Sequence, residues 1–443
     1  MSTDNGATCM IAPEGSYGSI DATDARALDD ATISGLTPRS LRLAEDSFIG
    51  AFDVLKQTTF ERNDIALNGG AAPLQVGSAI GSSGPVKRIS GDVPLMMEGR
   101  GFGSTAPADT ALGRLLSSGL AHTLRTPGTS VTATYVSLNT FTIVSPDDDG
   151  KIVAGDVIAA VQANGTFLFC MVTSAVDGGA TITVTTLEPH GYSGAGTFVV
   201  RQCHMWWAPT DNDPDGSSLV AQFAPKDAGH CLLAVGGRLA KVAIAANENK
   251  AIDFTCTVRF PDGEYRSAVV ITPSAPLPIG GAGSTGLRAF VSPVRITQDH
   301  SATAAPGYGT AATFPIRTWS VEIDVGLIPT SDPGTRSGLS GMRVSDATLT
   351  GTVVQSAPTS GADFREVVRL SEKRSVTLTA AGDNAAGNGM CVWIGAVEPT
   401  ADPGVKMAKR DRTQETNFKA GDFALASGAA AYVNRRWVLA FVA

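Results

Sequence analysis

Residues 251–260 read AIDFTCTVRF, and this stretch decides the fold class. Apolar and polar side chains alternate along it, with Ile252, Phe254, Cys256, Val258 and Phe260 on one side and Asp253, Thr255, Thr257 and Arg259 on the other. A period of two predicts a β-strand with one packed face and one face free to meet water or a channel. Asn247-Glu248-Asn249 provide a turn, so residues 231–260 are predicted to form a long hairpin.

A second strand pair with the same pattern lies nearer the C-terminus. Residues 317–328 (RTWSVEIDVGLI) alternate Trp319, Val321, Ile323 and Val325 against Ser320, Glu322 and Asp324. Residues 341–356 are predicted to form the partner strand. A short helix is expected at 363–371, and further strands at 375–380, 390–397 and 434–442.

The N-terminal part predicts another hairpin followed by a helix. Residues 47–62 and 86–99 are expected to be strands joined by a loop at 66–85 that is rich in Gly, Ala and Ser. A helix is predicted over 107–118, with Pro107 in its first turn, Ser104 or Thr105 as its cap and Gly119 at its end. Its apolar stripe is formed by Leu112, Leu115, Leu116 and Leu120, and Gly113 is expected to weaken it.

Residues 128–201 differ from their surroundings because short strands follow one another closely. The runs TATYVSL, FTIVS, DVIAAVQ, TFLFCMVT and ATITVTTL are separated by turn signals at Asp149-Gly150, Asn164-Gly165 and Asp177-Gly178-Gly179. This block is predicted to be a small β-barrel inserted into the parent domain.

The order of hairpin, helix and further strands occurs twice, which indicates a duplication at the level of pattern rather than of residues. We therefore predict a mainly β protein with two tandem β-sandwich domains, each with a flanking helix, plus the inserted barrel. The expected divisions are an N-terminal arm at 1–40, a first domain at 41–127 and 202–272, the barrel at 128–201, a linker at 273–315 and a second domain at 316–443.

Composition limits the classes of function. Of the 443 residues, 43% are hydrophobic and only 17% are charged, so much of the surface is suited to meeting protein. An ordinary soluble β-protein has a similar composition and stays open at this point. The net charge of −8 makes the chain a poor candidate for gripping nucleic acid, because phosphate contacts need Lys and Arg. No secretory signal or membrane-spanning run is expected.

Three possible sites for metals or phosphate are weak. Residues 211–216 (DNDPDG) resemble the start of a calcium loop, but Gln222 stands where a bidentate carboxylate is needed. Cys203 and His204 are adjacent, as are His230 and Cys231, and adjacent residues on a strand face opposite ways, which disfavours a zinc site. Gly99, Gly101 and Gly103 suit a sharp turn better than a phosphate loop.

Other chemistry is equally unsupported. Trp206 and Trp207 suit packing better than sugar stacking. The cysteines are scattered without a CxxC pair and are expected to be reduced. No cofactor and no catalytic group is predicted, so the chain is not expected to be an enzyme.

Three segments resemble bacteriophage tail tube proteins of long-tailed, siphophage-like phages. They are FDVLKQTTFERNDIAL at 52–67, VPLMMEGRGFGSTAPADTALGRLLSSGLAHT at 93–123, and GGRLAKVAIAANENKAIDFTCTVRFPDGEY at 236–265. The second half is similar to that family in its order of elements alone. The barrel and the long N-terminal arm depart from the minimal family pattern.

The resemblance implies a structural virion protein whose subunits form rings that stack into a hollow tail tube, through which genomic DNA passes without specific binding. Two tandem tube domains imply a homotrimeric ring with pseudo-sixfold symmetry, and a single domain implies a homohexamer. Expected partners are further copies of the chain and other tail proteins (tape measure, terminator and distal tail), with assembly in the host cytoplasm and residence in the virion tail.

An acidic lumen repels DNA and lets it slide. The candidates for lumen-facing carboxylates are Asp53, Asp92, Asp253, Glu322 and Asp324, and for each of them a solvated outer face is the alternative. Two other functions remain open: a virion adhesin or decoration protein that displays the barrel, and a polysaccharide-degrading enzyme, for which no carboxylate pair near aromatic clusters is evident.

Overall fold

The computed structural model shows a mainly β protein. It describes residues 8–13, 39–41, 91–127, 130–144, 152–163, 165–209, 218–224, 231–247, 250–266, 274–277, 280–281, 284–288, 295–296, 312–313, 316–331, 339–356, 375–382, 387–400, 405–408, 411–422 and 435–443. The predicted strand at 47–62, the loop at 66–85 and the helix at 363–371 lie outside these residues.

The long hairpins lie side by side in what we call the main sheet. Its strands run in the order β3 (Gly91–Glu98), β13 (Asp253–Phe260), β12 (Cys231–Ala246), β18 (Ile316–Ser331), β19 (Leu339–Ser356) and β24 (Asp411–Ala420), all antiparallel. The alternation read from residues 251–260 and 317–328 is confirmed, because Phe254, Cys256, Val321 and Ile323 are buried while Asp253 and Asp324 are exposed.

Shorter strands extend the main sheet into a 13-stranded array. Next to β24 lie β22 (Val397–Pro399) and β23 (Val405–Ala408). The first part of β12 pairs with β11 (Leu219–Ala224) and β14 (Asp262–Arg266), and β11 continues to β1 (Thr8–Pro13), β2 (Arg39–Leu41) and β15 (Ser274–Leu277). Part of the predicted N-terminal arm therefore pairs with the rest of the chain.

A second sheet faces the main sheet across the core. Its strands run in the order β17 (Ala312–Thr313), β16 (Arg295–Ile296), β20 (Val376–Ala381), β21 (Gly389–Ile394), β25 (Trp437–Val442), β10 (Thr197–Trp207) and β4 (Ala121–Thr123). Both sheets thus join strands of the two predicted halves, since β12 pairs with β18 and β10 pairs with β25.

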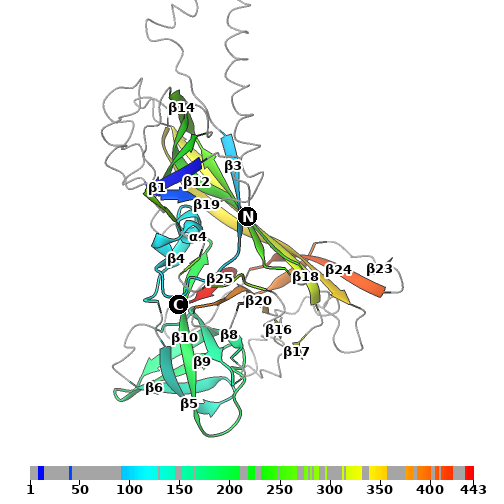
Figure 1. Cartoon of the computed structure of the whole chain (residues 1–443). Coiled ribbons are helices and arrows are strands. Elements are labelled where there is room, and N and C mark those ends of the chain that lie inside the picture. The colour runs from blue at the N-terminus through cyan, green and yellow to red at the C-terminus, as the bar shows by residue number, and fades with distance from the viewer. Residues whose placement is uncertain are drawn as a thin grey trace, which may run out of the picture.

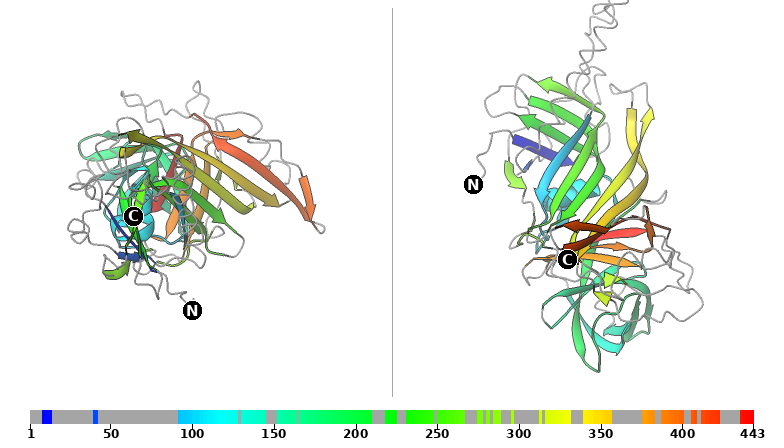
Figure 2. Two further views of the ribbon diagram at one scale, coloured as in Figure 1. Left: turned by 90° about the horizontal axis from the view of Figure 1, so that it is seen from above. Right: turned by 90° about the vertical axis from the view of Figure 1, so that its right-hand side faces the viewer.

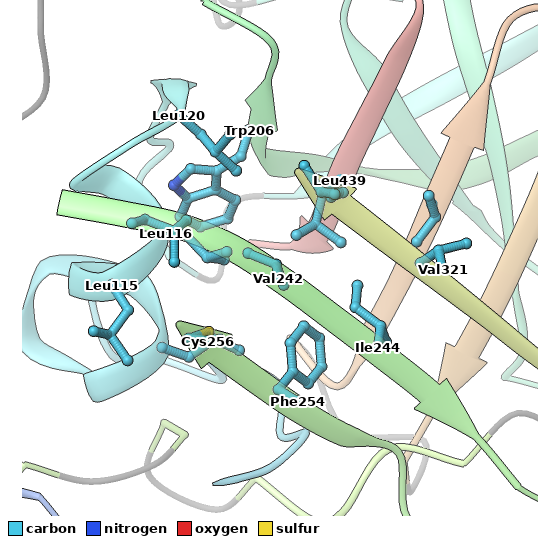
Figure 3. Close-up of a cluster of buried hydrophobic side chains, with 14 of the residues drawn as sticks. Leu115, Leu116, Leu120, Trp206, Val242, Ile244, Phe254, Cys256, Val321 and Leu439 are labelled. Atoms are coloured by element: carbon cyan, nitrogen blue, oxygen red, sulfur yellow. The ribbon is translucent and has the colours of Figure 1, made fainter. Parts of the chain in front are cut away.

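The core between the two sheets is closed on one side by a short helix, α4 (Ala111–Ser117). Figure 3 shows leucines of the helix region beside Trp206 of β10, Val242 of β12 and Leu439 of β25. The apolar stripe predicted from the leucine spacing is confirmed, because all four leucines are buried.

The helix itself is shorter than predicted and is capped differently. Residues Pro107–Asp109 form a 3-10 turn, η1. Thr110 has an extended backbone and separates this turn from α4. The Thr110 hydroxyl accepts a hydrogen bond from the Gly113 amide at 3.1 Å, so Thr110 and not Ser104 or Thr105 is the cap.

The predicted small β-barrel is confirmed as a closed, six-stranded barrel. Its strands follow the order β10, β5 (Ser130–Ser137), β6 (Thr140–Val144), β9 (Thr181–Thr186), β8 (Phe167–Asp177) and β7 (Val157–Val161), and β7 pairs with β10 again. The interior is filled by its own apolar cluster. Figures 1 and 2 show the barrel at one end of the molecule, the main sheet towards the other, and the second sheet between them.

Candidate assembly surfaces

The outward side chains of the main sheet form one continuous surface, which we call the polar sheet face. It carries the exposed or half-buried residues of β3, β13, β12, β18, β19 and β24 that point away from the core. Four predicted carboxylates lie on it: Asp92 on β3, Asp253 on β13, and Glu322 and Asp324 on β18. Asp53 lies outside the described residues. The register therefore brings together residues that are far apart in the sequence.

Cations neutralise part of this acidic face. Arg259 on β13 lies opposite Asp92 and donates two hydrogen bonds to its carboxylate, at 2.7 and 2.8 Å. The hydrogen bond to Asp92 is the main cause that raises the pKa of Arg259, and the charges of Asp92 and Asp324 add to it. Lys241 on β12 pairs with Glu322 at 2.6 Å. Both ion pairs are partly solvated, so each contributes little to stability.

One part of the polar sheet face brings like charges together. The register places Asp253 directly opposite Glu98 on β3, and like charges in that position are destabilising. Arg100 relieves the repulsion because its guanidinium pairs with Glu98 at 2.8 Å. Asp253 makes no ion pair with any described residue, so none of these residues offsets its negative charge on this face.

The outside of the barrel has a different chemistry. Across β10, β5, β6, β9 and β8 the register aligns a row of directly opposite residues: Thr197, Thr134, Thr142, Thr183 and Val176. Exposed valines flank this row at Val136, Val144 and Val199. We call this uncharged region the Thr/Val face. An exposed surface with few charges and many β-branched side chains is suited to contact with another molecule.

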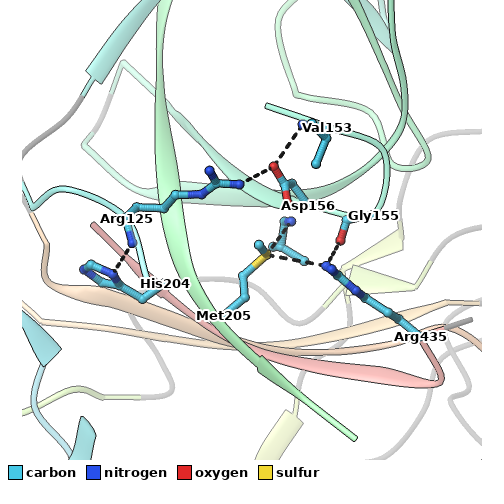
Figure 4. A network of polar contacts seen from close by, with 8 residues as sticks. Arg125, Val153, Gly155, Asp156, His204, Met205 and Arg435 are labelled. Carbon is cyan, nitrogen blue, oxygen red and sulfur yellow. Dashed lines mark hydrogen bonds and ion pairs between the residues drawn. The ribbon is translucent and has the colours of Figure 1, made fainter. Parts of the chain in front are cut away.

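The junction between the barrel and the second sheet contains a buried polar network (Figure 4). The Asp156 carboxylate, just before β7, accepts hydrogen bonds from the Arg125 guanidinium at 2.7 Å and from the Val153 amide at 3.0 Å. Burial raises the pKa of Asp156, and the Arg125 charge opposes that rise. Arg435 donates to the Gly155 carbonyl oxygen and stacks on the Trp207 ring, 4.0 Å from its centroid. No pattern in the sequence predicts this network.

Cys203 and His204 face opposite sides of β10, as the strand geometry predicts. Cys203 lies in the apolar cluster between the barrel and the second sheet, whereas the His204 ring packs edge-on against Phe102. Burial raises the pKa of the Cys203 thiol and lowers that of His204 to about 4. Within the described part of the chain no group of three His, Cys, Asp or Glu residues is placed to hold a metal.

The remaining residues considered for chemistry serve packing or are not described. Trp206 is buried in the main core, and Gln222 is buried on β11. His230 and residues 211–216 lie outside the described residues. A Cβ at Gly101 would approach the Gly387 carbonyl oxygen to 2.2 Å, so the glycine-rich turn after β3 allows close backbone packing rather than phosphate binding.

Comparison with models of known protein families gives no match, and no curated protein matches the chain. The helices in the described residues are all too short or too polar to cross a membrane. The case for a function therefore rests on the two surfaces and on the sequence resemblance.

Proposed function

We propose that this chain is a bacteriophage tail tube protein that assembles into stacked rings around a channel for DNA. The observation that supports the proposal best is the polar sheet face. Two long hairpins, β12–β13 and β18–β19, lie next to each other in one sheet, and their polar sides are on the same face. Two long hairpins per chain fit two tube-type sandwich domains, and hence a homotrimeric ring with pseudo-sixfold symmetry. A homohexameric ring is the alternative.

The edges of the main sheet support ring closure. Among the described strands, β22 and β23 end the sheet beyond β24, and β3, the expected partner of the strand predicted at 47–62, ends it on the other side. Unpaired edges invite uncontrolled association, and joining sheets from several subunits into one closed barrel removes them. Such head-to-tail contacts form a ring when the rotation between subunits closes. Figure 1 shows β18, β19, β24 and β23 extending sideways from the body, where a neighbouring subunit can reach them.

The charge of the polar sheet face suits a channel wall. Its carboxylates include Asp253 and Asp324, and two of its cations, Arg259 and Lys241, are engaged in ion pairs with Asp92 and Glu322. A wall of this kind offers few free cations to phosphate and so lets DNA slide. The tape measure, terminator and distal tail proteins of the phage are the partners that this role requires, and the virion tail is the location.

Electron microscopy of the purified full-length protein tests the proposal. We expect hollow filaments or stacked rings, and averaged end views with threefold symmetry. A protein that stays monomeric at high concentration and is found in virions only on capsids or fibres would contradict the tube.

A charge-reversal pair tests the lumen. The variant carrying Asp253→Lys and Asp324→Lys should still form tubes, but these tubes should retain DNA in a salt-dependent way because lysines on the wall bind phosphate. The matched control places Thr134→Lys and Thr183→Lys on the Thr/Val face, outside the tube, and should retain less DNA. Equal retention of DNA by the two variants would show that the polar sheet face does not line the lumen.

A second function is favoured by the Thr/Val face. The barrel lies at one end of the molecule, and its exposed valines suit a virion decoration protein or adhesin that displays the barrel. Binding of the full-length protein to whole host cells, lost when Val144→Lys and Val176→Lys are introduced, would support this function. The two functions are compatible if the barrel decorates the outside of the tube.

A further inference from the structure

Glu188 is a fully buried carboxylate at the junction of the barrel and the second sheet. It lies just after β9 and accepts three hydrogen bonds. The Met171 amide of β8 donates to Oε2 at 2.7 Å, and the Ser375 hydroxyl and the Trp393 indole donate to Oε1, each at 2.7 Å. Its own backbone is held by Thr186, whose hydroxyl donates to the Glu188 carbonyl oxygen at 2.8 Å.

The donors come from both bodies that meet at this junction. Met171 belongs to the barrel, whereas Ser375 precedes β20 and Trp393 lies on β21, at sequence separations of 187 and 205 residues from Glu188. Phe167, Phe169 and Met171 of β8 share one apolar cluster with Trp393 and residues of the second sheet. Glu188 is thus a directional polar contact beside this apolar cluster, in addition to the contacts that Arg125 and Arg435 make with Asp156 and Gly155.

Two of the three donors, the Met171 amide and the Trp393 indole, require an acceptor at each oxygen of residue 188. A backbone amide and an indole N–H can only donate, and each of these two donors faces a different oxygen of Glu188. A glutamine would turn an NH2 group towards either Met171 or Trp393, and a buried donor would then lose its partner. Apolar contacts tolerate more than one packing arrangement, whereas a set of directional hydrogen bonds selects a single one.

We propose that Glu188 is a positioning residue that sets the orientation of the barrel on the second sheet. The strand β10, which runs through both the barrel and the second sheet, connects the two bodies along one line. Glu188 adds a connection at β8, away from the contacts of Arg125 and Arg435, and so opposes rotation of the barrel about β10. This role does not depend on whether the chain builds a tube.

Distance measurement between two spin labels tests the orientation directly. The labels are placed at cysteines introduced at Thr134 on the barrel and Thr350 on the main sheet, both of which are exposed. Cys9 and Cys231 are replaced by serine, while Cys170, Cys203, Cys256 and Cys391 are buried and can stay. In the wild-type background, pulsed electron paramagnetic resonance should give one narrow distance distribution.

Glu188→Gln should broaden or shift that distribution while circular dichroism stays unchanged. The matched control is Glu398→Gln, which removes an exposed carboxylate paired with Lys419 and should leave the distribution narrow. A Glu188→Gln protein with the wild-type distance and width would overturn the proposal.

A double variant sharpens the test. In Glu188→Gln with Trp393→Phe, the amide NH2 can donate to the Ser375 hydroxyl and the amide oxygen can accept from the Met171 amide, so no donor is left opposite another donor. We expect the distribution to narrow again relative to Glu188→Gln alone, and a further broadening would count against the proposal.

If Glu188→Gln does not fold, the variant Ser375→Ala with Trp393→Phe takes its place. It removes both donors on the second-sheet side and leaves the carboxylate bound to the barrel only. A broadened distribution supports the positioning role, and a narrow one at the wild-type distance overturns it.

Discussion

At the scale of single residues, buried His204 makes the stability of the folded protein depend on pH. Its Nδ1 accepts a hydrogen bond from the Arg125 amide at 3.0 Å, so a proton on Nδ1 would break that bond. Burial, helped by the Arg125 charge, lowers the pKa of His204 from 6.5 to about 4. Between these values the unfolded chain binds a proton that the folded protein does not bind. The contribution of His204 to the unfolding free energy is therefore fully present above pH 6.5. It decreases as the pH falls below 6.5 and is lost once the pH has fallen through 4.

This linkage predicts a flatter pH profile for His204→Asn. Asparagine keeps an acceptor for the Arg125 amide but does not titrate. Between pH 6.5 and 4 the wild type should lose about 3 kcal/mol more unfolding free energy than the variant, the upper bound for a pKa shift of this size. Urea unfolding at a series of pH values measures the difference. Parallel profiles for the two proteins would show that His204 titrates normally.

Gly113 is expected to stabilise the protein although glycine has a low helix propensity. Gly113→Ala should destabilise the protein by about 1–3 kcal/mol, because the added Cβ would lie 2.2 Å from the Pro107 carbonyl oxygen. Propensity alone predicts a gain of about 1 kcal/mol in a helix interior. Urea unfolding decides the sign. The control is Gly196→Ala, where a Cβ meets nothing within 4 Å and little change is expected.

At the scale of elements, the pairing of β3 with β13 contains one repulsive and one attractive charge pair. Asp253→Asn removes the repulsion from Glu98 opposite it, and we expect the unfolding free energy to rise by roughly 0.2–0.5 kcal/mol. The gain should shrink in high salt because both groups are solvated.

The attractive pair in the same two strands provides the comparison. Asp92→Asn removes the partner of Arg259 and should lower the unfolding free energy by up to about 1 kcal/mol, a small value because both side chains are nearly half exposed. Chemical denaturation at low and high salt measures both variants. Changes of the same sign in the two variants would contradict the register argument.

At the scale of the whole molecule, the two halves of the chain are interleaved. The main sheet joins β12 to β18, the second sheet joins β10 to β25, and the largest core cluster contains residues of both halves. A fragment of residues 1–272 would expose the edges and the apolar face that the second half covers.

We therefore predict that fragments 1–272 and 316–443 do not fold when they are expressed separately. Each should be insoluble or lack the cooperative unfolding transition of the full chain, as measured by circular dichroism during heating. When the two fragments are expressed together, part of each should become soluble and the two should purify as a complex. Two soluble fragments that each unfold cooperatively would show instead that the two halves are independent domains.

The sequence by itself determined the β class, the individual long strands and the closed barrel. Alternation with a period of two is a local property, and burial of one face follows from it, as residues 253–260 and 319–325 show. Turn signals such as Asp177-Gly178-Gly179 set the hairpins of the barrel, and Gly179 has the positive φ that its turn requires. Of the candidate carboxylates, the four described ones lie on the polar side of their strands for the same local reason.

Only the tertiary structure decided which strands are neighbours and which charges meet. The pairing of β12 with β18 and the contacts of Glu188 join residues separated by tens to hundreds of positions, and no local pattern encodes such partners. The capping by Thr110 and the need for Gly113 also depend on how η1 packs on α4. Strand alternation specifies a face but not the neighbour, because every antiparallel strand offers the same backbone donors and acceptors at its edges.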